Sequence, residues 1–299
     1  MTDIALNRVA RVVDAPTLLE GEGFEVRRPI PARGLEAVGP FIMLDHFGPV
    51  RYGPGEAKGA PTHPHAGIET LTYLLAGTAR HLDSLSNASL MGPGDAQWMR
   101  AGSGVIHDEG ADAAFQAKGG VYHGVQLWLN MPLGRRGEPP AYRHIAAAEM
   151  PAFACGDAEA RLLAGKMDGY VGPLETHTDP LLAHVTVKAG GRARIDAKAA
   201  ERAVYLLGGT GRVDGCDAIV GRLLVLGEGD GIDLAAGAEG ADLLILGGPP
   251  LDAPIVRYGP FVMNSEAELV GAIDAYNAGR FGRIRQPEKT AAGSTARSP

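Results

Sequence analysis

Two parts of this chain repeat each other at a nearly constant distance, and this repetition limits the fold more than any other feature. Residues 73–78 (YLLAGT) resemble residues 205–210 (YLLGGT), an offset of 132 positions. A Gly-Asp pair followed by Ala-Gly recurs between 94–102 and 229–237, an offset of 135 positions. Self-similarity at a fixed offset indicates a repeated structural unit. We therefore expect two copies of one unit, which agrees with two domains in 299 residues.

Each unit is expected to consist of short strands. The chain contains 43 glycines and 21 prolines, spread along its length. This density of helix-breaking residues favours short strands joined by tight turns. Segments 70–75, 121–129 and 181–187 are rich in β-branched and aromatic residues and are bounded by Gly, Pro or Asp. Regularly spaced short strands are typical of a sandwich or a barrel.

One stretch near the C-terminus predicts a helix. Ser265 with Glu268 forms a capping box, in which the serine is the N-cap and the glutamate follows three residues later. Leu269, Ile273 and Tyr276 then recur at helical spacing, and we expect this stripe to pack against a barrel. Gly279 occupies the position where such a helix ends. Residues 287–299 are small and polar, and we expect a disordered tail there.

Composition excludes several classes of protein. Lys and Arg number 28 against 35 Asp and Glu, a formal net charge of −7, so the chain lacks the basic character of a nucleic-acid-binding protein. Arg135-Arg136 is a short basic pair that we expect in solvent. Two cysteines, Cys155 and Cys216, cannot build a disulfide framework. No apolar run approaches the ~20 residues of a membrane helix, and residues 1–13 lack the apolar core of a signal peptide. We expect a cytoplasmic protein without nucleic-acid or membrane partners.

Two local histidine patterns suggest a metal site: His63-Pro64-His65 and His107-Asp108-Glu109. In a strand, residues i and i+2 point to the same face, so each pattern offers two ligands on one side. If both strands line one barrel, three imidazoles and one carboxylate meet, a set that suits Fe(II), Mn, Ni, Cu or Zn, with Fe(II) favoured. Either pattern alone also occurs on ordinary protein surfaces. Pro64 cannot donate a ladder hydrogen bond, so its strand is expected at an edge or to be irregular.

The sequence around these patterns resembles the pirin family of the cupin superfamily. Residues 63–77 (HPHAGIETLTYLLAG) resemble the family's first metal motif, and residues 92–109 (GPGDAQWMRAGSGVIHDE) resemble the second. The resemblance covers nearly the whole chain in order and is strongest over residues 39–130. Four further segments also match: 41–49 (FIMLDHFGP), 126–130 (QLWLN), 259–264 (GPFVMN) and 279–282 (GRFG).

The resemblance implies an all-β bicupin, with two antiparallel, jelly-roll-like β-barrels and a short C-terminal helix. The implied domains are an N-terminal metal-binding cupin barrel over residues 1–140 and a C-terminal cupin barrel without metal over residues 141–286. The family's terminal segments cross over and tie the two barrels together. We therefore expect one compact unit, a monomer.

The resemblance also carries a ligand set onto His63, His65, His107 and Glu109. Other cupins ligate through a glutamate at the position of Glu69, which stays open here as an alternative ligand or as a structural residue.

The second copy has no matching histidines. By the two offsets, the four ligand positions correspond to residues 195, 197, 242 and 244, which hold Ile, Ala, Asp and Leu. We expect His177 and His184 to be ordinary surface or packed residues.

Some pirin-like proteins act as quercetin 2,3-dioxygenases, which cleave the heterocyclic ring of a flavonol with O2 and release carbon monoxide. The resemblance thus implies a flavonol substrate at a mononuclear non-haem Fe(II) site. Glu109 would serve as ligand and candidate general base. Trp98, Met99 and Phe47 are candidates for an apolar pocket wall.

Two other functions stay open. Other pirins bind a transcription factor or a metabolic enzyme, with iron as a structural or redox-sensing element. An enzyme acting on another substrate is the third alternative, because a fold and a ligand set do not fix a substrate.

Overall fold

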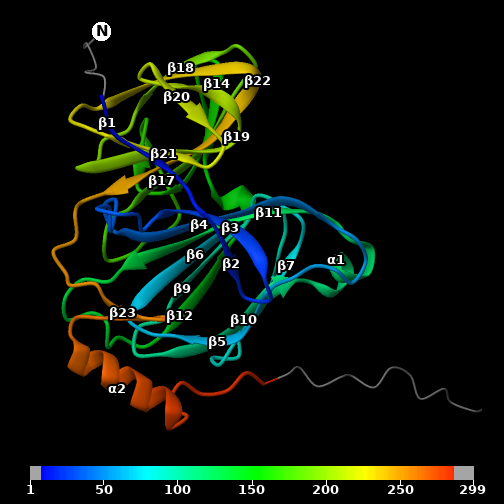
Figure 1. Cartoon of the computed structure of the whole chain (residues 1–299), viewed down its shortest axis with the longest axis vertical. Helices are drawn as coiled ribbons and strands as arrows, with labels where there is room; N and C mark the ends of the chain where they lie inside the picture. Colours follow the sequence, from blue (N-terminus) through cyan, green and yellow to red (C-terminus); the bar gives the residue numbers. More distant parts are fainter. Residues whose placement is uncertain (1–7, 286–299) are drawn as a thin grey trace, which may run out of the picture.

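The computed structural model describes residues 8–285 and shows two β-barrels, one above the other in Figure 1. Residues 287–299, for which we expected a disordered tail, lie outside the described residues. The first barrel consists of β2 (Thr17–Glu20), β3 (Phe24–Ile30), β4 (Phe41–Tyr52), β5 (Ala60–His65), β6 (Ile68–Ala76), β7 (Ala79–Asp83), β8 (Ala88–Met91), β9 (Ala96–Arg100), β10 (Val105–Ala111), β11 (Gly120–Asn130) and β12 (Ala141–Ile145). The second consists of β1 (Val9–Asp14), β13 (Ala152–Cys155), β14 (Ala158–Ala164), β17 (Leu181–Val187), β18 (Arg192–Asp196), β19 (Glu201–Val213), β20 (Cys216–Ile219), β21 (Arg222–Leu226) and β22 (Gly231–Gly248).

The two barrels share one strand arrangement, which confirms the predicted all-β bicupin. The large sheet of the first barrel has the order β12-β9-β6-β11-β4-β3-β2, and that of the second has β1-β21-β19-β22-β17-β14-β13. The repeated sequences lie on β6 and β19, which occupy the same place in their sheets. All the pairs between named strands are antiparallel. The segments 70–75, 121–129 and 181–187, which were expected to be strands, lie in β6, β11 and β17.

The N-terminal segment packs on the second barrel, and the C-terminal segment packs on the first. β1 pairs with β21 and so completes the sheet of the second barrel, although it precedes the first barrel in sequence. After β22 the chain descends to β23 (Val256–Tyr258) and β24 (Phe261–Met263) beside the first barrel (Figure 1). There, Ala66 and Phe261 form a parallel bridge. The predicted domain limit at residue 140 stays a prediction. β12, which follows this limit in sequence, pairs with β9 of the first barrel.

Arg136 fastens the returning segment to the first barrel. It is 3% exposed, so the expectation that it lies in solvent is wrong for this residue. Its guanidinium donates to the carbonyl oxygens of Val262 and Pro254, each at 2.6 Å, and to the side chain of Asn130. A guanidinium carries five donors in a planar fork, so one side chain can satisfy several carbonyls of a segment that lies far from it in sequence.

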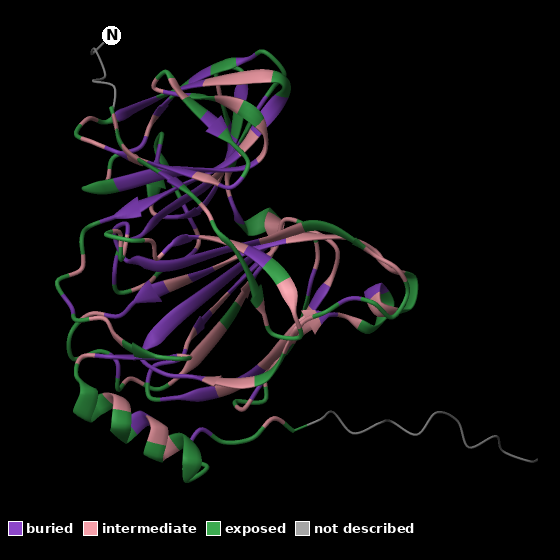
Figure 2. Cartoon of the chain, in the orientation of Figure 1, coloured by how far each residue is buried: buried purple, intermediate pink, exposed green. Residues whose placement is uncertain are grey.

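The main apolar core joins the two barrels face to face. One cluster contains Leu71 and Leu127 of the first barrel together with Leu207 and Leu244 of the second. The buried strands that form this junction stand out between the two barrels in Figure 2. A continuous apolar layer of this kind favours one rigid unit over two hinged domains.

Two tyrosine–histidine pairs cross this junction in opposite directions. Tyr73 Oη of the first barrel lies 2.9 Å from His184 Nδ1 of the second. Tyr205 Oη of the second barrel lies 3.0 Å from His46 Nδ1 of the first. The two tyrosines are the first residues of the repeated sequences, so the exchange follows the internal repeat. His184 is therefore a packed residue at the junction.

The predicted C-terminal helix is confirmed as α2 (Glu266–Asn277). Ser265 Oγ accepts from Glu268 N, and Gly279 follows the helix with a φ of +73°. Leu269 and Ile273 pack against a small cluster around Phe261.

The remaining short elements are α1 (Ala113–Lys118), which the sequence did not predict, the 3-10 turn η1 (Ala147–Glu149) and the hairpin of β15 (Lys166–Met167) with β16 (Tyr170–Val171). Neither α1 nor α2, the two α-helices within the described residues, is long and apolar enough to cross a membrane.

Candidate metal centre

The two histidine patterns lie on adjacent strands of the first barrel. β5 carries His63 and His65, and β10 carries His107 directly opposite His63. β5 is the edge strand of the sheet β5-β10-β7-β8, as Pro64 predicted, because an edge strand tolerates a missing N–H. The i, i+2 spacing turns both β5 histidines to one face of the sheet, and His107, paired with His63, projects to the same face.

Three imidazoles converge at this place. The Nε2 atom of His63 lies 3.0 Å from Nε2 of His65 and 2.9 Å from Nε2 of His107. His107 is fully buried and His65 nearly so, while His63 is partly exposed. The structure therefore brings together the three histidines that the sequence singled out.

Backbone carbonyls fix how two of these rings are oriented. His63 Nδ1 lies 2.7 Å from the Pro61 oxygen, and His65 Nδ1 lies 3.2 Å from the Pro260 oxygen. A carbonyl can only accept, so both Nδ1 atoms carry a proton, and the Nε2 atom of each ring presents a lone pair when the ring is neutral. Two lone pairs 3.0 Å apart repel unless a cation or proton lies between them. This donor set fits a divalent metal, because a neutral imidazole binds a metal through one ring nitrogen while a carbonyl accepts the N–H of the other.

Burial keeps these rings in the form that binds metal. Desolvation, together with the neighbouring imidazole of His63, lowers the pKa of His65 to about 3. Desolvation and the other ring nitrogens likewise hold the pKa of His107 well below its usual value. Both rings are therefore neutral at physiological pH and offer lone pairs instead of protons.

Glu109 lies beside this group instead of within it. Its carboxylate forms a second cluster with His81 and His107, on the Nδ1 side of the His107 ring. Oε1 accepts hydrogen bonds from Gln97 Nε2 and, at 3.4 Å, from Thr72 Oγ1. The β5–β10 register shifts between His107 and Glu109, so strict alternation along β10 does not aim the two side chains at one point.

His81 is a site residue that the sequence reading missed. It is fully buried on β7, directly opposite Glu109, with Nδ1 3.7 Å from Oε1 of that carboxylate. Its Nε2 lies 3.3 Å from Asp83 Oδ2. Burial opposes the charged ring, but the contacts with Asp83 and Glu109 outweigh it and raise the pKa of His81. The signal was available, since His81-Leu82-Asp83 repeats the His-x-acid spacing of the second motif.

Glu69, the alternative ligand, is not in either cluster of metal-ligating residues found within residues 8–285. It lies on β6 opposite Arg100 and on the same face as Leu71, which belongs to the junction core. Only 1% of the residue is exposed, and neither carboxylate oxygen has a hydrogen-bond partner. Desolvation raises the pKa of Glu69 to about 7.

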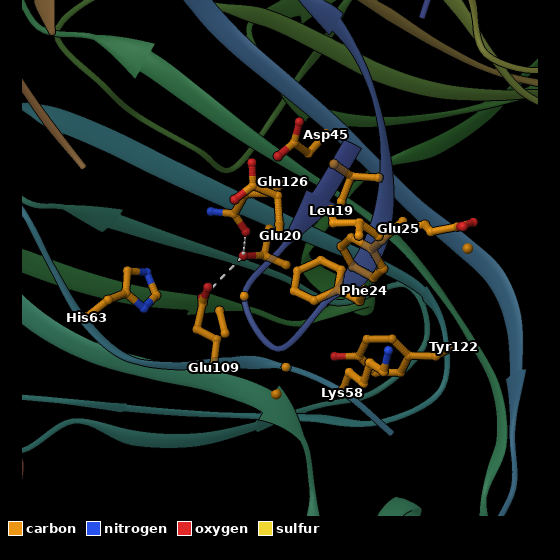
Figure 3. A pocket seen from close by; sticks show the side chains of 18 of the residues that line it. Leu19, Glu20, Phe24, Glu25, Asp45, Lys58, His63, Glu109, Tyr122 and Gln126 are labelled. Carbon is orange, nitrogen blue, oxygen red and sulfur yellow. Dashed lines mark hydrogen bonds between the residues drawn. The ribbon is translucent and has the colours of Figure 1, made fainter. Parts of the chain in front are cut away.

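A cavity of about 1160 Å³ opens beside the three histidines. His63, His65 and Glu109 reach its wall, and Figure 3 shows His63 and Glu109 projecting into it from neighbouring strands. Phe47 lines the cavity as expected, whereas Met99 is buried in a separate apolar cluster and Trp98 packs against the junction core. Further apolar lining comes from Leu19, Phe24, Val26, Met43 and Trp128. A space of this size and character accommodates a small aromatic molecule.

The second barrel is apolar where the first holds its histidines. Ile195, at the offset of His63, pairs with Ile232 on β22 as His63 pairs with His107 on β10. Both isoleucines and Ala197 belong to the buried core of that barrel.

Two barrels of the same strand order, with a histidine cluster in the first, identify the protein as a bicupin. Comparison with known sequences gives the family: residues 23–129 match the family described as Pirin, and residues 182–282 match the Pirin C-terminal cupin domain. The chain belongs to the pirin family.

Relatives of known sequence and structure agree. The chain is 38% identical to "Putative quercetin 2,3-dioxygenase PA2418" of Pseudomonas aeruginosa, over 87% of this chain and 93% of that protein. It is 33% identical to a pirin-like protein of Caulobacter vibrioides, over 86% and 90%. The crystal structure of a quercetin 2,3-dioxygenase from Acinetobacter baumannii matches with a TM-score of 0.87 at 30% identity, over 94% of this chain and all of that one.

Proposed function

We propose that this protein is a metal-dependent dioxygenase that opens the heterocyclic ring of a flavonol such as quercetin with O2 and releases carbon monoxide. The observation that carries the proposal is the convergence of three imidazoles beside a large, partly apolar cavity. The names of the relatives from Pseudomonas aeruginosa and Acinetobacter baumannii support the same substrate class.

In this proposal the Nε2 atoms of His63, His65 and His107 hold the metal, and the Glu109 carboxylate turns from the Nδ1 side of the His107 ring to become the fourth ligand. A nitrogen-rich set with one carboxylate and open positions favours non-haem Fe(II) among the divalent transition metals. When bound, the metal would acidify the flavonol 3-hydroxyl and supply the redox chemistry that O2 requires. The lone pairs of His63 and His65 are already aimed by the carbonyls of Pro61 and Pro260.

Glu109 also has the position of a general base. Its carboxylate reaches the cavity wall, where a bound substrate hydroxyl can donate to it. Gln97 and Thr72 hold Oε1, which restricts the carboxylate while it accepts the proton. The aromatic side chains of Phe24, Phe47 and Trp128 would pack against the flavonol rings and keep water away.

The test is metal analysis combined with an aerobic flavonol assay on the same preparation. Fe(II)-loaded protein should bleach the flavonol absorbance band, and a His63→Ala/His107→Ala double variant should lose both metal and turnover. His177→Ala removes an imidazole that pairs with Glu138 near the surface, and it should retain both.

Each failure has a distinct meaning. A normal metal load in the double variant would refute the metal site. No turnover across a flavonol panel by fully loaded protein would refute the dioxygenase and leave an iron-binding regulatory protein. That second function predicts a protein partner whose retention changes with the oxidation state of the iron.

A further inference from the structure

We propose that Gln126 and Asp45 form a subsite for a phenolic hydroxyl of the substrate, on a ring that lies away from the metal. The inference rests on the proposed function insofar as the substrate is a flavonol. It adds the residues that would select among flavonols by their hydroxyl groups. The two side chains lie at a break in a row of polar residues that crosses the cavity wall.

The row crosses the interior face of the large sheet of the first barrel. Strand pairing places four polar residues directly opposite one another on β9, β6, β11 and β4, namely Gln97, Thr72, Gln126 and Asp45. Residues directly opposite on neighbouring strands project from the same face of a sheet. All four line the cavity, and all except Gln126 are buried. Burial of polar groups costs free energy unless they are hydrogen-bonded, so such a row needs partners.

Apolar side chains flank the row on both sides. On one side, Met43 lies opposite Trp128, each two positions along its strand from a member of the row. On the other side, Phe47 lies two positions from Asp45. All three apolar residues line the cavity. A planar aromatic molecule can therefore rest against them while its polar substituents follow the row.

Hydrogen bonds divide the row into two parts. In the first part, Gln97 Nε2 donates to Thr72 Oγ1 at 3.3 Å, and the Thr72 hydroxyl donates to Gln126 Oε1 at 2.6 Å. In the second part, the Arg28 guanidinium donates to both carboxylate oxygens of Asp45, at 2.6 and 2.5 Å. Among the hydrogen bonds of residues 8–285, none joins Gln126 to Asp45.

The two sides of this break have opposite hydrogen-bonding character. Because Thr72 occupies Gln126 Oε1, the group left over is the amide nitrogen Nε2, a donor without a partner among the described residues. The Asp45 carboxylate only accepts, and it has lone pairs beyond the two that Arg28 uses. Both side chains are labelled in Figure 3. A hydroxyl accepts and donates, so it can bridge Gln126 and Asp45, whereas a C–H group cannot.

The subsite is within reach of a flavonol whose 3-hydroxyl lies at the metal. Thr72 Oγ1 is 3.4 Å from Glu109 Oε1, at the end of the row near the histidines. Neighbouring strands are about 4.8 Å apart, so the middle of the Gln126–Asp45 pair lies about 7 Å across the sheet from Thr72. The three rings of a flavonol extend over such a distance, and either outer ring can supply the hydroxyl.

The experiment measures equilibrium binding of flavonols to Zn(II)-loaded protein in air-free buffer, where no turnover occurs. The flavonols are compared in pairs that differ by one hydroxyl, at the 7- or the 4′-position. At one of these positions, deletion of the hydroxyl should weaken binding to the wild type about tenfold, as expected for one hydrogen bond to a charged group. In Gln126→Met the same deletion should change affinity by less than about twofold, because the variant has already lost the interaction.

Glu25→Gln is the matched control. Glu25 is an exposed carboxylate of the cavity lining that lies outside the row. This variant should keep the hydroxyl preference of the wild type. A preference of wild-type size in Gln126→Met would overturn the subsite, and so would its equal loss in Glu25→Gln.

A methyl ether of the same hydroxyl tests Asp45 without altering the protein. The ether oxygen still accepts from Gln126, but it has no proton for Asp45. Methylation should therefore weaken binding to the wild type at least as much as deletion does. If Gln126→Met fails to fold, this comparison decides, and equal affinities for the hydroxyl and its ether would overturn the subsite.

The outcomes also separate the subsite from the proposed function. Flavonols that bind without any hydroxyl preference would overturn the subsite and leave the dioxygenase intact. A preference that Gln126→Met abolishes, in a protein whose Fe(II) form turns over no flavonol, would support the subsite and refute the dioxygenase. Absence of binding across the whole panel would overturn both.

Discussion

The Nδ1 atom of His65 lies 3.2 Å from the carbonyl oxygen of Pro260, a residue 195 positions further along the chain. Pro260 belongs to the segment that leaves the second barrel and returns to the first. A residue beyond the second barrel therefore orients a histidine of the candidate metal centre. This contact ties the integrity of the centre to the crossing of the C-terminal segment.

Gly67→Ala should push the C-terminal segment that contains Pro260 and Val262 away from the histidine cluster. Gly67 has a φ of +77°, and an added Cβ would lie 1.9 Å from the carbonyl oxygen of Val262. The left-handed backbone costs a non-glycine residue about 1–2 kcal/mol, and the collision adds to this by displacing β24. We expect a loss of more than about 3 kcal/mol in unfolding free energy, of the size seen for overpacking and backbone strain combined, and weaker metal binding.

Gly55→Ala is the matched control, because Gly55 has a φ of +78° with nothing within 4 Å of an added Cβ. It should cost only the backbone term, about 1–2 kcal/mol, and leave metal affinity unchanged. Denaturant unfolding and chelator competition measure both quantities. Equal losses in the two variants would contradict the role of the Gly67–Val262 approach.

Glu69→Gln should stabilise the protein in a pH-dependent way. The pKa of Glu69 rises from its ordinary 4.5 to about 7 in the folded protein. The unfolded chain therefore releases the proton first, and folding stability falls as pH rises from about 4.5 to 7. The glutamine variant carries no such proton, so its advantage over wild type should grow across this window to about 2–3 kcal/mol.

Melting temperatures at pH 5 and pH 8 test this prediction. Glu228→Gln, at an exposed position, should show no such pH-dependent difference. A constant offset between Glu69→Gln and wild type at both pH values would show that the buried carboxyl does not ionise in this range.

Tyr73→Phe and Tyr205→Phe should each destabilise the protein by about 1–2 kcal/mol. Each substitution leaves the Nδ1 of a junction histidine, His184 or His46, without its hydroxyl partner. Each pair joins a tyrosine of one barrel to a histidine of the other, and the apolar core between the barrels stays intact in both variants. Unfolding should therefore remain one cooperative transition at a lower denaturant midpoint. Tyr258→Phe, at a residue 67% exposed, should have little effect. A second transition in either junction variant would show that the barrels unfold independently.

Acid should destabilise the same junction. Burial and the neighbouring His123 lower the pKa of His46 to about 3, and burial lowers that of His123 to about 4. The unfolded chain binds protons at these positions from about pH 6.5 downward while the folded protein resists, so stability falls between about pH 6.5 and 4. His123→Gln should flatten this acid limb in a plot of unfolding free energy against pH. An unchanged slope would assign the acid sensitivity to other groups.

The repeat between residues 73–78 and 205–210 and the glycine and proline content predicted two copies of a unit of short strands, and the spacing of His63 with His65 predicted two imidazoles on one strand face. The resemblance to the pirin family added the bicupin fold and the ligand set. These sequence patterns are local or periodic properties. A strand turns residues i and i+2 to one face whatever surrounds it, and a capping box such as Ser265 with Glu268 acts within one helical turn.

The tertiary structure alone decided which groups meet across strands and barrels. Alternation placed Glu109 with His107, but the register shift on β5 and the pairing with β7 turned its carboxylate toward Gln97 and His81. Arg136 gave no sign in sequence that it would be buried, because two of its partners are backbone carbonyls more than 100 positions away. Periodicity fixes the direction of a side chain relative to its own strand, whereas pairing register, strand order and the crossing of the chain ends determine what lies in that direction.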